Sequence, residues 1–254
     1  MASNNLQGKV IVITGGTKGI GLAVAQRVSA AGASVVLNYS WDASAAEAAI
    51  ASLPATGGSA DRALVVKADA SDPSQIRDLV ERTVAKFGRI DVLVANAGTM
   101  PLQDLEHLTE STFNSTFALN VKGPLFLTQA ASPHMPPGGR VIFISTGVAR
   151  FSGVLPGYGL YAATKGAVEQ LTRVLSKDLG RKGITVNAVA PGPTDTELFR
   201  KGKSEAMIKG IASANPFNRL GTPSEIAEVV AFVASPESSW VSGQIIGANG
   251  AAFV

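Results

Sequence analysis

Tyr161 and Lys165 are the two residues whose types and spacing most directly suggest chemistry. They lie four positions apart in a run with apolar residues at helical spacing, which predicts a long helix carrying both side chains on one face. A free phenol has a pKa of roughly 10, and a neighbouring ammonium favours its ionised form. We therefore expect Lys165 to lower the pKa of Tyr161, so that the pair can give a proton to a carbonyl oxygen or take one from an alcohol. An exposed pair on a solvated helix face is the alternative, and this short motif alone does not exclude it.

Composition narrows the classes of site that the chain can hold. Its 254 residues, 46% hydrophobic and 16% charged, suit one large α/β domain or two small ones. The chain has no cysteine, which excludes disulfides and thiolate catalysis. Only His107 and His134 supply imidazoles, and no cluster has metal-ligand spacing, which argues against a zinc enzyme or a Ser-His-Asp hydrolase. We expect no bound metal.

Charge and hydropathy give no sign of nucleic-acid or membrane partners. The net charge is +3, and the basic residues are scattered along the chain. No apolar run reaches the length of a membrane span, and Met1–Gln7 is polar and lacks the apolar core of a signal peptide. Together with the lack of cysteine, which fits a reducing compartment, these features lead us to expect a cytoplasmic protein.

β-Branched runs alternate with helical patterns along the whole chain. The predicted strands are Lys9–Thr14, Ser34–Tyr39, Ala63–Lys67, Asp91–Ala95, Arg140–Ile144, Ile184–Ala190 and Ser242–Ala248. The predicted helices are one ending at Gly32, then Ala43–Leu53, Gln75–Phe87, Thr109–Ala131, the Tyr161 helix, Ser204–Ala212 and Pro223–Ala234, with a Gly/Ser loop at Thr56–Ala60. This alternation predicts an α/β fold, a Rossmann-type doubly wound parallel sheet of seven strands. Because no linker or repeat divides the chain, we expect a single domain over residues 1–254.

A glycine-rich turn follows the first predicted strand and opens a helix. It reads Gly15-Gly16-Thr17-Lys18-Gly19-Ile20-Gly21. Glycines let the backbone approach a pyrophosphate at a helix N-terminus, where free N–H groups favour an anion. Ligands of such sheets bind beyond the carboxyl ends of the strands, which is where Asn96, Ser145 and Pro191 also lie. The arrangement predicts a dinucleotide site.

The end of the second strand indicates which dinucleotide binds. An acidic residue at this position hydrogen-bonds a ribose 2′-hydroxyl and repels a 2′-phosphate. Here the chain reads Asn38-Tyr39-Ser40-Trp41, with no carboxylate before Asp42. Lys18 in the glycine turn adds a cation. Both features favour NADP(H) over NAD(H), although Lys18 could also be an ordinary surface lysine.

In their order and positions, these motifs resemble the short-chain dehydrogenase/reductase family over essentially the full length of the chain. The family's glycine signature is similar to Thr14–Gly21, and its Asn-Ala-Gly motif to Asn96-Ala97-Gly98. Its Tyr-x-x-x-Lys pair matches Tyr161 and Lys165, and its Pro-Gly after the sixth strand matches Pro191-Gly192. The basic residue in the turn resembles the NADP(H)-dependent ketoreductase type, such as fungal polyketide reductases and 3-oxoacyl carrier-protein reductases.

The resemblance implies a role for each matching residue. Tyr161 would be the acid/base, Lys165 would lower its pKa and hold the nicotinamide ribose, and Asn120 would hold a water for a proton relay. A hydroxyl after the fifth strand would orient the substrate oxygen. The implied NADP(H)-binding residues are Gly15, Thr17, Lys18, Gly19, Ile20, Gly21, Asn38, Tyr39, Ser40, Asp69, Ala70, Asn96, Ala97, Gly98, Tyr161, Lys165, Pro191, Gly192, Thr194 and Thr196.

The identity of the orienting hydroxyl is the one departure from the family pattern. The family's serine usually lies about thirteen or fourteen residues before the tyrosine. Ser145 and Thr146 lie sixteen and fifteen residues before Tyr161. The loop Gly147–Gly159 is therefore slightly longer than is usual in the family. Spacing favours Thr146 and residue type favours Ser145, and we expect Ser145 to be the catalytic hydroxyl. Tyr158 lacks a lysine four residues on, so we expect it to be a wall of the pocket.

The implied activity is reduction of a ketone by NADPH, on a small or medium organic substrate that could be polyketide-derived. A 3-oxoacyl carrier-protein reductase and an NADP⁺-dependent alcohol dehydrogenase are alternatives within the enzyme class. The alternative outside it is an NADP(H)-binding redox sensor, because a fold does not fix a function. The presence of Asn120, a hydroxyl, Tyr161 and Lys165 together favours the enzyme.

The segment from Thr194 to Pro216 is predicted to form a lid over the substrate, since long segments beside a site commonly gate it. Its apolar side chains Leu198, Phe199, Met207 and Ile211 could form a wall of the pocket. Its cations Arg200, Lys201 and Lys203 could meet an acidic substrate. A charged, solvated stretch over a packed helix is the alternative.

The apolar end Ala251-Ala252-Phe253-Val254 and two long Ala-rich helices suggest self-association across two-fold axes. Family resemblance makes a homotetramer the expected assembly.

Overall fold

Seven parallel strands form one sheet in the order β3-β2-β1-β4-β5-β6-β7. In this computed structural model the strands are β1 (Val10–Ile13), β2 (Ser34–Tyr39), β3 (Ala63–Lys67), β4 (Val92–Ala95), β5 (Arg140–Ile144), β6 (Thr185–Pro191) and β7 (Ile245–Ala248). The order reverses between β1 and β4, which is the switch point where ligands of such sheets bind. The predicted fold class is confirmed. The structure describes residues 5–54 and 59–253, so most of the loop predicted at Thr56–Ala60 lies outside the described residues.

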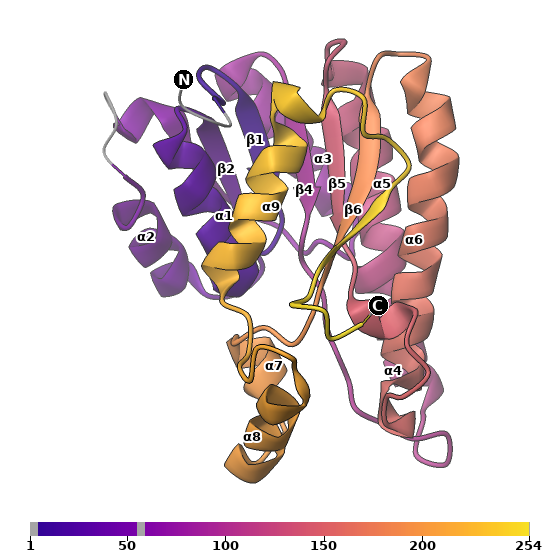
Figure 1. Cartoon of the computed structure of the whole chain (residues 1–254). Helices are drawn as coiled ribbons and strands as arrows, with labels where there is room; N and C mark the ends of the chain where they lie inside the picture. Colours follow the sequence, from indigo (N-terminus) through magenta and orange to yellow (C-terminus); the bar gives the residue numbers. More distant parts are fainter. Residues whose placement is uncertain (1–4, 55–58, 254) are drawn as a thin grey trace.

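Helices cover both faces of the sheet (Figure 1). They are α1 (Gly19–Ala30), α2 (Ala43–Ala51), α3 (Pro73–Phe87), α4 (Glu110–Phe117), α5 (Gly123–Ala131), α6 (Gly159–Gly180), α7 (Glu197–Arg200), α8 (Glu205–Ala214) and α9 (Pro223–Ala234). Side chains of α1, α2 and α9 join the core on one face, and those of α3, α5 and α6 join the core on the other. Figure 1 shows α7 and α8 projecting beyond one end of the sheet, away from both layers.

The strands are apolar on both faces because both faces are covered. In β1, Ile11 and Ile13 pack into the α1 and α9 side while Val12 packs into the α3 and α5 side, and all three are fully buried. Each such side chain contributes about 1.5–3 kcal/mol through burial. This is why the sheet reads in sequence as continuous β-branched runs rather than as an alternating pattern.

The helix predicted over Thr109–Ala131 is interrupted in its middle. α4 and α5 are joined by a π-helical turn, Ala118–Lys122, which contains Asn120. Asn120 is 1% exposed, and its side chain exchanges hydrogen bonds with the backbone of Thr99, accepting from the N–H and donating to the carbonyl, both at 2.9 Å. Its amide also donates to the hydroxyl of Thr164 in α6, at 3.1 Å. Such π turns often occur at functional sites, and here the turn carries a buried asparagine between two segments of the chain.

The segment after β6 is more ordered than the sequence predicted. Only a helix at Ser204–Ala212 was expected, but α7 precedes it, capped by the Thr196 hydroxyl, which accepts a hydrogen bond from the N–H of Phe199 at 3.1 Å.

The last strand, β7, begins at Ile245 and not at Ser242. Gly243, with a φ of 75°, turns the chain there, and its N–H donates to the carbonyl of Val186.

Candidate active site

A cavity of about 420 Å³ opens at the carboxyl ends of β4, β5 and β6. Sequence-predicted site residues from all parts of the chain line it, namely Ile20, Asn96, Gly98, Ser145, Tyr161, Lys165, Pro191, Gly192, Thr194 and Thr196. The structure thus brings together residues that are as much as 176 positions apart, between Ile20 and Thr196. Within the described residues, no group of His, Cys, Asp or Glu could hold a metal ion, and no helix could cross a membrane.

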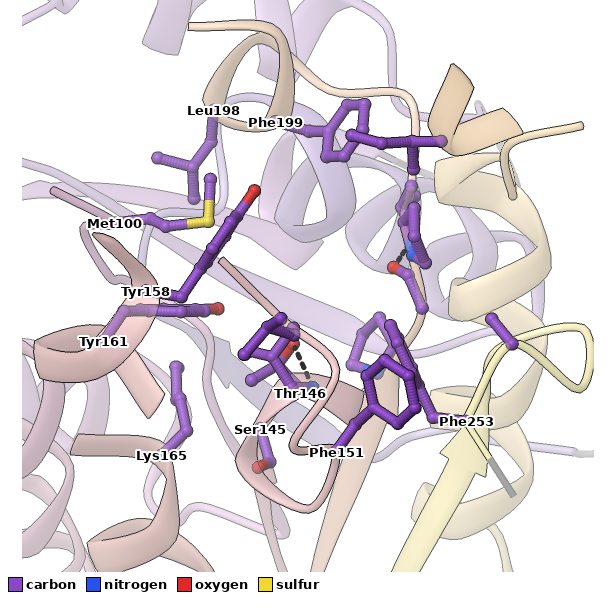
Figure 2. A pocket seen from close by; sticks show the side chains of 18 of the residues that line it. Met100, Ser145, Thr146, Phe151, Tyr158, Tyr161, Lys165, Leu198, Phe199 and Phe253 are labelled. Carbon is purple, nitrogen blue, oxygen red and sulfur yellow. Dashed lines mark hydrogen bonds between the residues drawn. The ribbon is translucent and has the colours of Figure 1, made fainter. Parts of the chain in front are cut away.

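Tyr161 and Lys165 lie on the face of α6 that meets the end of β5 (Figure 2). Lys165 is only 6% exposed, and its ammonium donates to the carbonyl of Ile144, the last residue of β5, at 2.6 Å. The same ammonium lies 5.8 Å from the centre of the Tyr161 ring. The two side chains are therefore neighbours on one face, and the alternative of an exposed, solvated pair is wrong.

The pKa of Tyr161 is raised in the structure, whereas Lys165 was expected to lower it. Burial raises the pKa of the Tyr161 phenol to about 12, against a smaller lowering by its hydrogen bond with Thr146. Burial also lowers the pKa of Lys165 to about 8. The physical reason is desolvation, which disfavours the charged form of both groups. The protein alone therefore holds Tyr161 as a neutral phenol, which is the proton-donating form.

Ser145 and Thr146 point to opposite sides of the backbone, as neighbours at the end of a strand do. The side chain of Thr146 faces the Tyr161 hydroxyl and lowers its pKa, while the Thr146 hydroxyl accepts from the N–H of Val148 at 3.5 Å. The Ser145 hydroxyl instead donates to the carboxylate of Glu169 at 3.1 Å, and in Figure 2 it points away from Tyr161. The expectation that Ser145 is the hydroxyl beside the tyrosine is thus corrected. Both residues line the cavity, but Glu169 of α6 accepts the hydrogen bond of Ser145 and holds its hydroxyl away from Tyr161.

Asn120 lies behind the pair, and Gly98 connects the two. A side chain at Gly98 would lie 3.2 Å from the Asn120 side-chain oxygen and 3.7 Å from the Lys165 ammonium, so only glycine leaves this approach free. The hydrogen bonds of Asn120 with Thr99 and Thr164 satisfy both ends of its amide within the protein. Its role in holding a water for a proton relay stays a prediction.

The glycine turn leaves the N-terminus of α1 open. Lys18 precedes the helix and makes no side-chain cap, so the first N–H groups of α1 keep their capacity to bind an anion. Gly15 and Gly19 adopt positive φ values of 60° and 55°, and Gly21 lies so close to the Gly15 carbonyl that no side chain would fit. Ile20 reaches the cavity from the first turn of α1, and Thr17 is partly exposed in the turn itself.

The side chain of Asn38 is buried and bonded to the backbone of neighbouring segments. It is 2% exposed, its amide donates to the carbonyl of Ala68 at 2.7 Å, and its oxygen accepts from the N–H of Gly15 at 3.3 Å. It therefore ties the glycine turn to the end of β3. Tyr39 is partly exposed and Ser40 is exposed, so their side chains are accessible. The following carboxylate, Asp42, is used as the N-cap of α2, which leaves none at the end of β2.

The other predicted binding residues lie around the same edge of the sheet. The Asp69 carboxylate accepts from the N–H of Ser71, and Ala70 is buried, with its carbonyl against Gly123. Asn96 donates to the carbonyls of Thr14 and Gly15 at 2.9 and 3.1 Å, while the N–H of Ala97 donates to the Thr14 hydroxyl. The Asn-Ala-Gly segment is thus bonded to the end of β1 across the switch point.

Lys18 is held by two partners outside the turn. Its ammonium makes an ion pair of 2.9 Å with Glu197 of α7 and lies 5.5 Å from the centre of the Trp41 ring. Both side chains of the ion pair are more than half exposed, so solvent and salt weaken it. A phosphate placed near Lys18 would compete with Glu197 for this ammonium.

The predicted lid forms one wall of the cavity. Leu198, Phe199, Met207 and Ile211 all line it, together with Tyr158 from the opposite side, as expected. None of the lid cations is among the described lining residues. Arg200 pairs with Asp195 and Glu205, and Lys203 donates to the carbonyl of Phe199 at 2.6 Å. The expectation of a cationic contact with an acidic substrate is therefore not supported.

Several pocket residues were not identified from the sequence, among them Met100, Phe151 and Phe253. Met100 follows the Asn-Ala-Gly motif, and Phe151 and Phe253 lie with ring centres 5.1 Å apart at the far side of the cavity (Figure 2). Phe253 packs directly on Gly147, where any side chain would clash. This phenylalanine was taken as part of an apolar end for self-association, but it is used within its own chain. Val254 lies outside the described residues.

The chain is similar over nearly its full length to known reductases and dehydrogenases. A family model described as enoyl-(acyl carrier protein) reductase matches residues 15–250. The chain is 38% identical to hydroxynaphthalene reductase of Aspergillus fumigatus, over 94% of this chain and 90% of that protein. It is 37% identical to versicolorin reductase 1 of Aspergillus parasiticus, over 99% and 98%. A short-chain dehydrogenase of Burkholderia cenocepacia, solved in complex with NADP, has a TM-score of 0.90 at 36% identity, with 98% and 99% covered.

We expect the two hydroxyls to differ in their effect on turnover. Thr146→Val keeps the shape of the side chain but removes its hydrogen bond with Tyr161, and should lower kcat/KM by roughly 10²-fold. Ser145→Ala keeps the Thr146 hydroxyl but removes the hydrogen bond of Ser145 to Glu169, and should cost only about tenfold. Steady-state kinetics at saturating dinucleotide measure both. A larger loss in Ser145→Ala than in Thr146→Val would contradict the assignment of the hydroxyl.

We also expect a defined pH dependence. Lys165 loses its proton as the pH rises through about 8, whereas Tyr161, with a pKa of about 12, stays protonated there. If the phenol is the proton donor and the ammonium assists it, kcat/KM for reduction is constant at lower pH and falls as the pH rises through about 8. The measurement is a pH profile of kcat/KM. A rate that instead falls as the pH is lowered from 8 would indicate that a deprotonated group carries the reaction.

Proposed function

The chain belongs to the short-chain dehydrogenase/reductase family of oxidoreductases, and within it we propose that the protein reduces a ketone on an aromatic, fused-ring substrate with NADPH. The observation that carries this proposal is a neutral, half-buried Tyr161 phenol that faces Thr146 beside an apolar cavity. The family's reactions convert carbonyl and hydroxyl groups, so the remaining questions are the cofactor, the substrate and the direction.

The residues of this chain support a reductive proton transfer. The Tyr161 hydroxyl can donate its proton to a carbonyl oxygen, because a phenol is protonated near neutral pH and the raised pKa of Tyr161 extends that form to higher pH. Thr146 can donate a second hydrogen bond to the same oxygen as negative charge develops on it. The buried Lys165 ammonium can stabilise the phenolate that Tyr161 becomes, since it lies 5.8 Å from the centre of the ring.

The edge of the sheet fits an NADPH molecule. The uncapped N-terminus of α1 can bind a pyrophosphate, and the nearby Lys18 can bind a 2′-phosphate in place of Glu197. No carboxylate stands at the end of β2 to repel that phosphate, because Asp42 caps α2. When bound, NADPH would supply the hydride. NADP in the similar Burkholderia cenocepacia enzyme also supports this choice.

The cavity wall supports an aromatic substrate of moderate size. Aromatic side chains line it, Phe151, Tyr158 and Phe199 among them, whereas none of the lid cations is among its described lining residues. The cavity of about 420 Å³ is shared with the nicotinamide end of the cofactor, and flat rings pack well on the aromatic side chains of the remaining wall. Relatives named for hydroxynaphthalene and versicolorin reduction support the same substrate class.

A homo-oligomer, with the tetramer as the expected form, is part of this proposal. Apolar side chains on three neighbouring helices are partly exposed, Phe113 on α4 (43%), Phe126 on α5 (36%) and Val174 on α6 (55%). Burial of such side chains between copies would stabilise an assembly.

A panel of ketones tests the proposed function. We expect NADPH oxidation, followed by absorbance, to be fastest in kcat/KM with fused-ring aromatic ketones and at least about tenfold slower with short linear ketones and 3-oxoacyl thioesters. The same assay with NADH should give a markedly lower kcat/KM, because NADH has no 2′-phosphate for Lys18 to bind. Preference for a 3-oxoacyl thioester, or equal use of both cofactors, would contradict the proposal.

A further inference from the structure

Glu169 is a buried carboxylate that the proton transfer does not use. It lies in α6, one turn after Lys165, and is 3% exposed. One of its oxygens accepts from the Ser145 hydroxyl at 3.1 Å, and the other pairs with the Arg150 guanidinium at 2.8 Å. Arg173 approaches the second oxygen at 3.5 Å from the next turn of α6. A buried charge is costly unless it is paired and hydrogen-bonded, and this one has both kinds of partner.

Lys165 and Glu169 of α6 bond to two consecutive residues at the end of β5. Lys165 donates to the carbonyl of Ile144, and four residues later Glu169 accepts from the hydroxyl of Ser145. The next residue is Thr146, whose hydroxyl bonds Tyr161, also from α6. Because neighbouring side chains of an extended chain point in opposite directions, fixing Ser145 toward Glu169 fixes Thr146 toward Tyr161.

Arg150 extends the same attachment to the wall of the cavity. It lies in the loop between Thr146 and Tyr158, which the sequence marks as longer than is usual. Its neighbours Val148 and Phe151 line the cavity, while its own side chain reaches back to Glu169. The ion pair therefore sets where this loop lies relative to α6, although Arg150 itself does not line the cavity.

We propose that Glu169 is a positioning residue for the reaction, which holds Thr146 against Tyr161 through Ser145 and holds the pocket wall through Arg150. It touches neither substrate nor cofactor and acts only through these two partners. The inference rests on the proposed reductase function for its kinetic consequences, but the attachment of the loop is independent of that function.

Two variants of Glu169 separate its two attachments. Glu169→Gln can still accept from Ser145 but loses the charge that pairs with Arg150, and should raise the KM for the ketone about tenfold while kcat stays within about threefold. Arg150→Met should reproduce this result. Glu169→Ala loses both partners and should in addition lower kcat by about tenfold or more. Arg173→Met is the matched control, because it removes the more distant arginine, and should stay within about twofold in both constants.

Two further measurements keep the test independent of folding and of the substrate. The dissociation constant of NADPH, measured by fluorescence, should stay within about twofold in all folded variants, because none of these residues lines the cofactor edge. Limited trypsin digestion should cleave after Arg150 in Glu169→Gln far faster than in the wild type or Arg173→Met, as read by mass spectrometry. If the wild type reduces no ketone of the panel, the proposed function fails while the digestion still reports on the attachment. Cleavage of Glu169→Gln at the wild-type rate, or a wild-type KM in an active Glu169→Gln, would overturn the inference.

Discussion

The site depends on the buried contact between Lys165 and the carbonyl of Ile144. This bond joins α6 to the end of β5 at the cavity, and it removes an ammonium from water. With Lys165 in place, Tyr161 lies beside the end of β5, and a side chain at Gly98 would press on Asn120 at 3.2 Å. The same burial that lowers the pKa of Lys165 raises that of Tyr161, so one structural constraint positions the proton donor and keeps its proton on it.

Features with a strong local signal could be predicted from the sequence. Strands buried on both faces read as β-branched runs, and their alternation with helices determines a parallel sheet and its switch point. The position of the glycine turn directly after β1 follows from the same pattern. The four-residue spacing of Tyr161 and Lys165 was enough to predict one shared helix face. The apolar wall formed by the segment after β6 also follows from residue types, since Leu198 and Phe199 line the cavity.

Features that depend on distant partners could not be predicted in the same way. The choice between Ser145 and Thr146 is made by Glu169, 24 residues away from Ser145, and nothing near the strand end reveals it. The direction of the pKa shift of Tyr161 depends on how much water reaches it, which spacing does not show. Phe253 lines the cavity because Gly147 leaves room for its ring, and these two residues are far apart in the sequence.

The most direct measurement of the central claim is the turnover of Tyr161→Phe beside its binding of NADPH. The ring still fills its place, but the proton donor is absent, and general acid catalysis is typically worth about 10²–10⁴-fold. The account predicts a loss of ketone-dependent NADPH oxidation in that range, with an NADPH dissociation constant, measured by fluorescence, close to that of the wild type. Tyr158→Phe removes the neighbouring phenol of the pocket wall and should cost less than about tenfold. Ketone reduction by Tyr161→Phe within tenfold of the wild type would mean that another group supplies the proton.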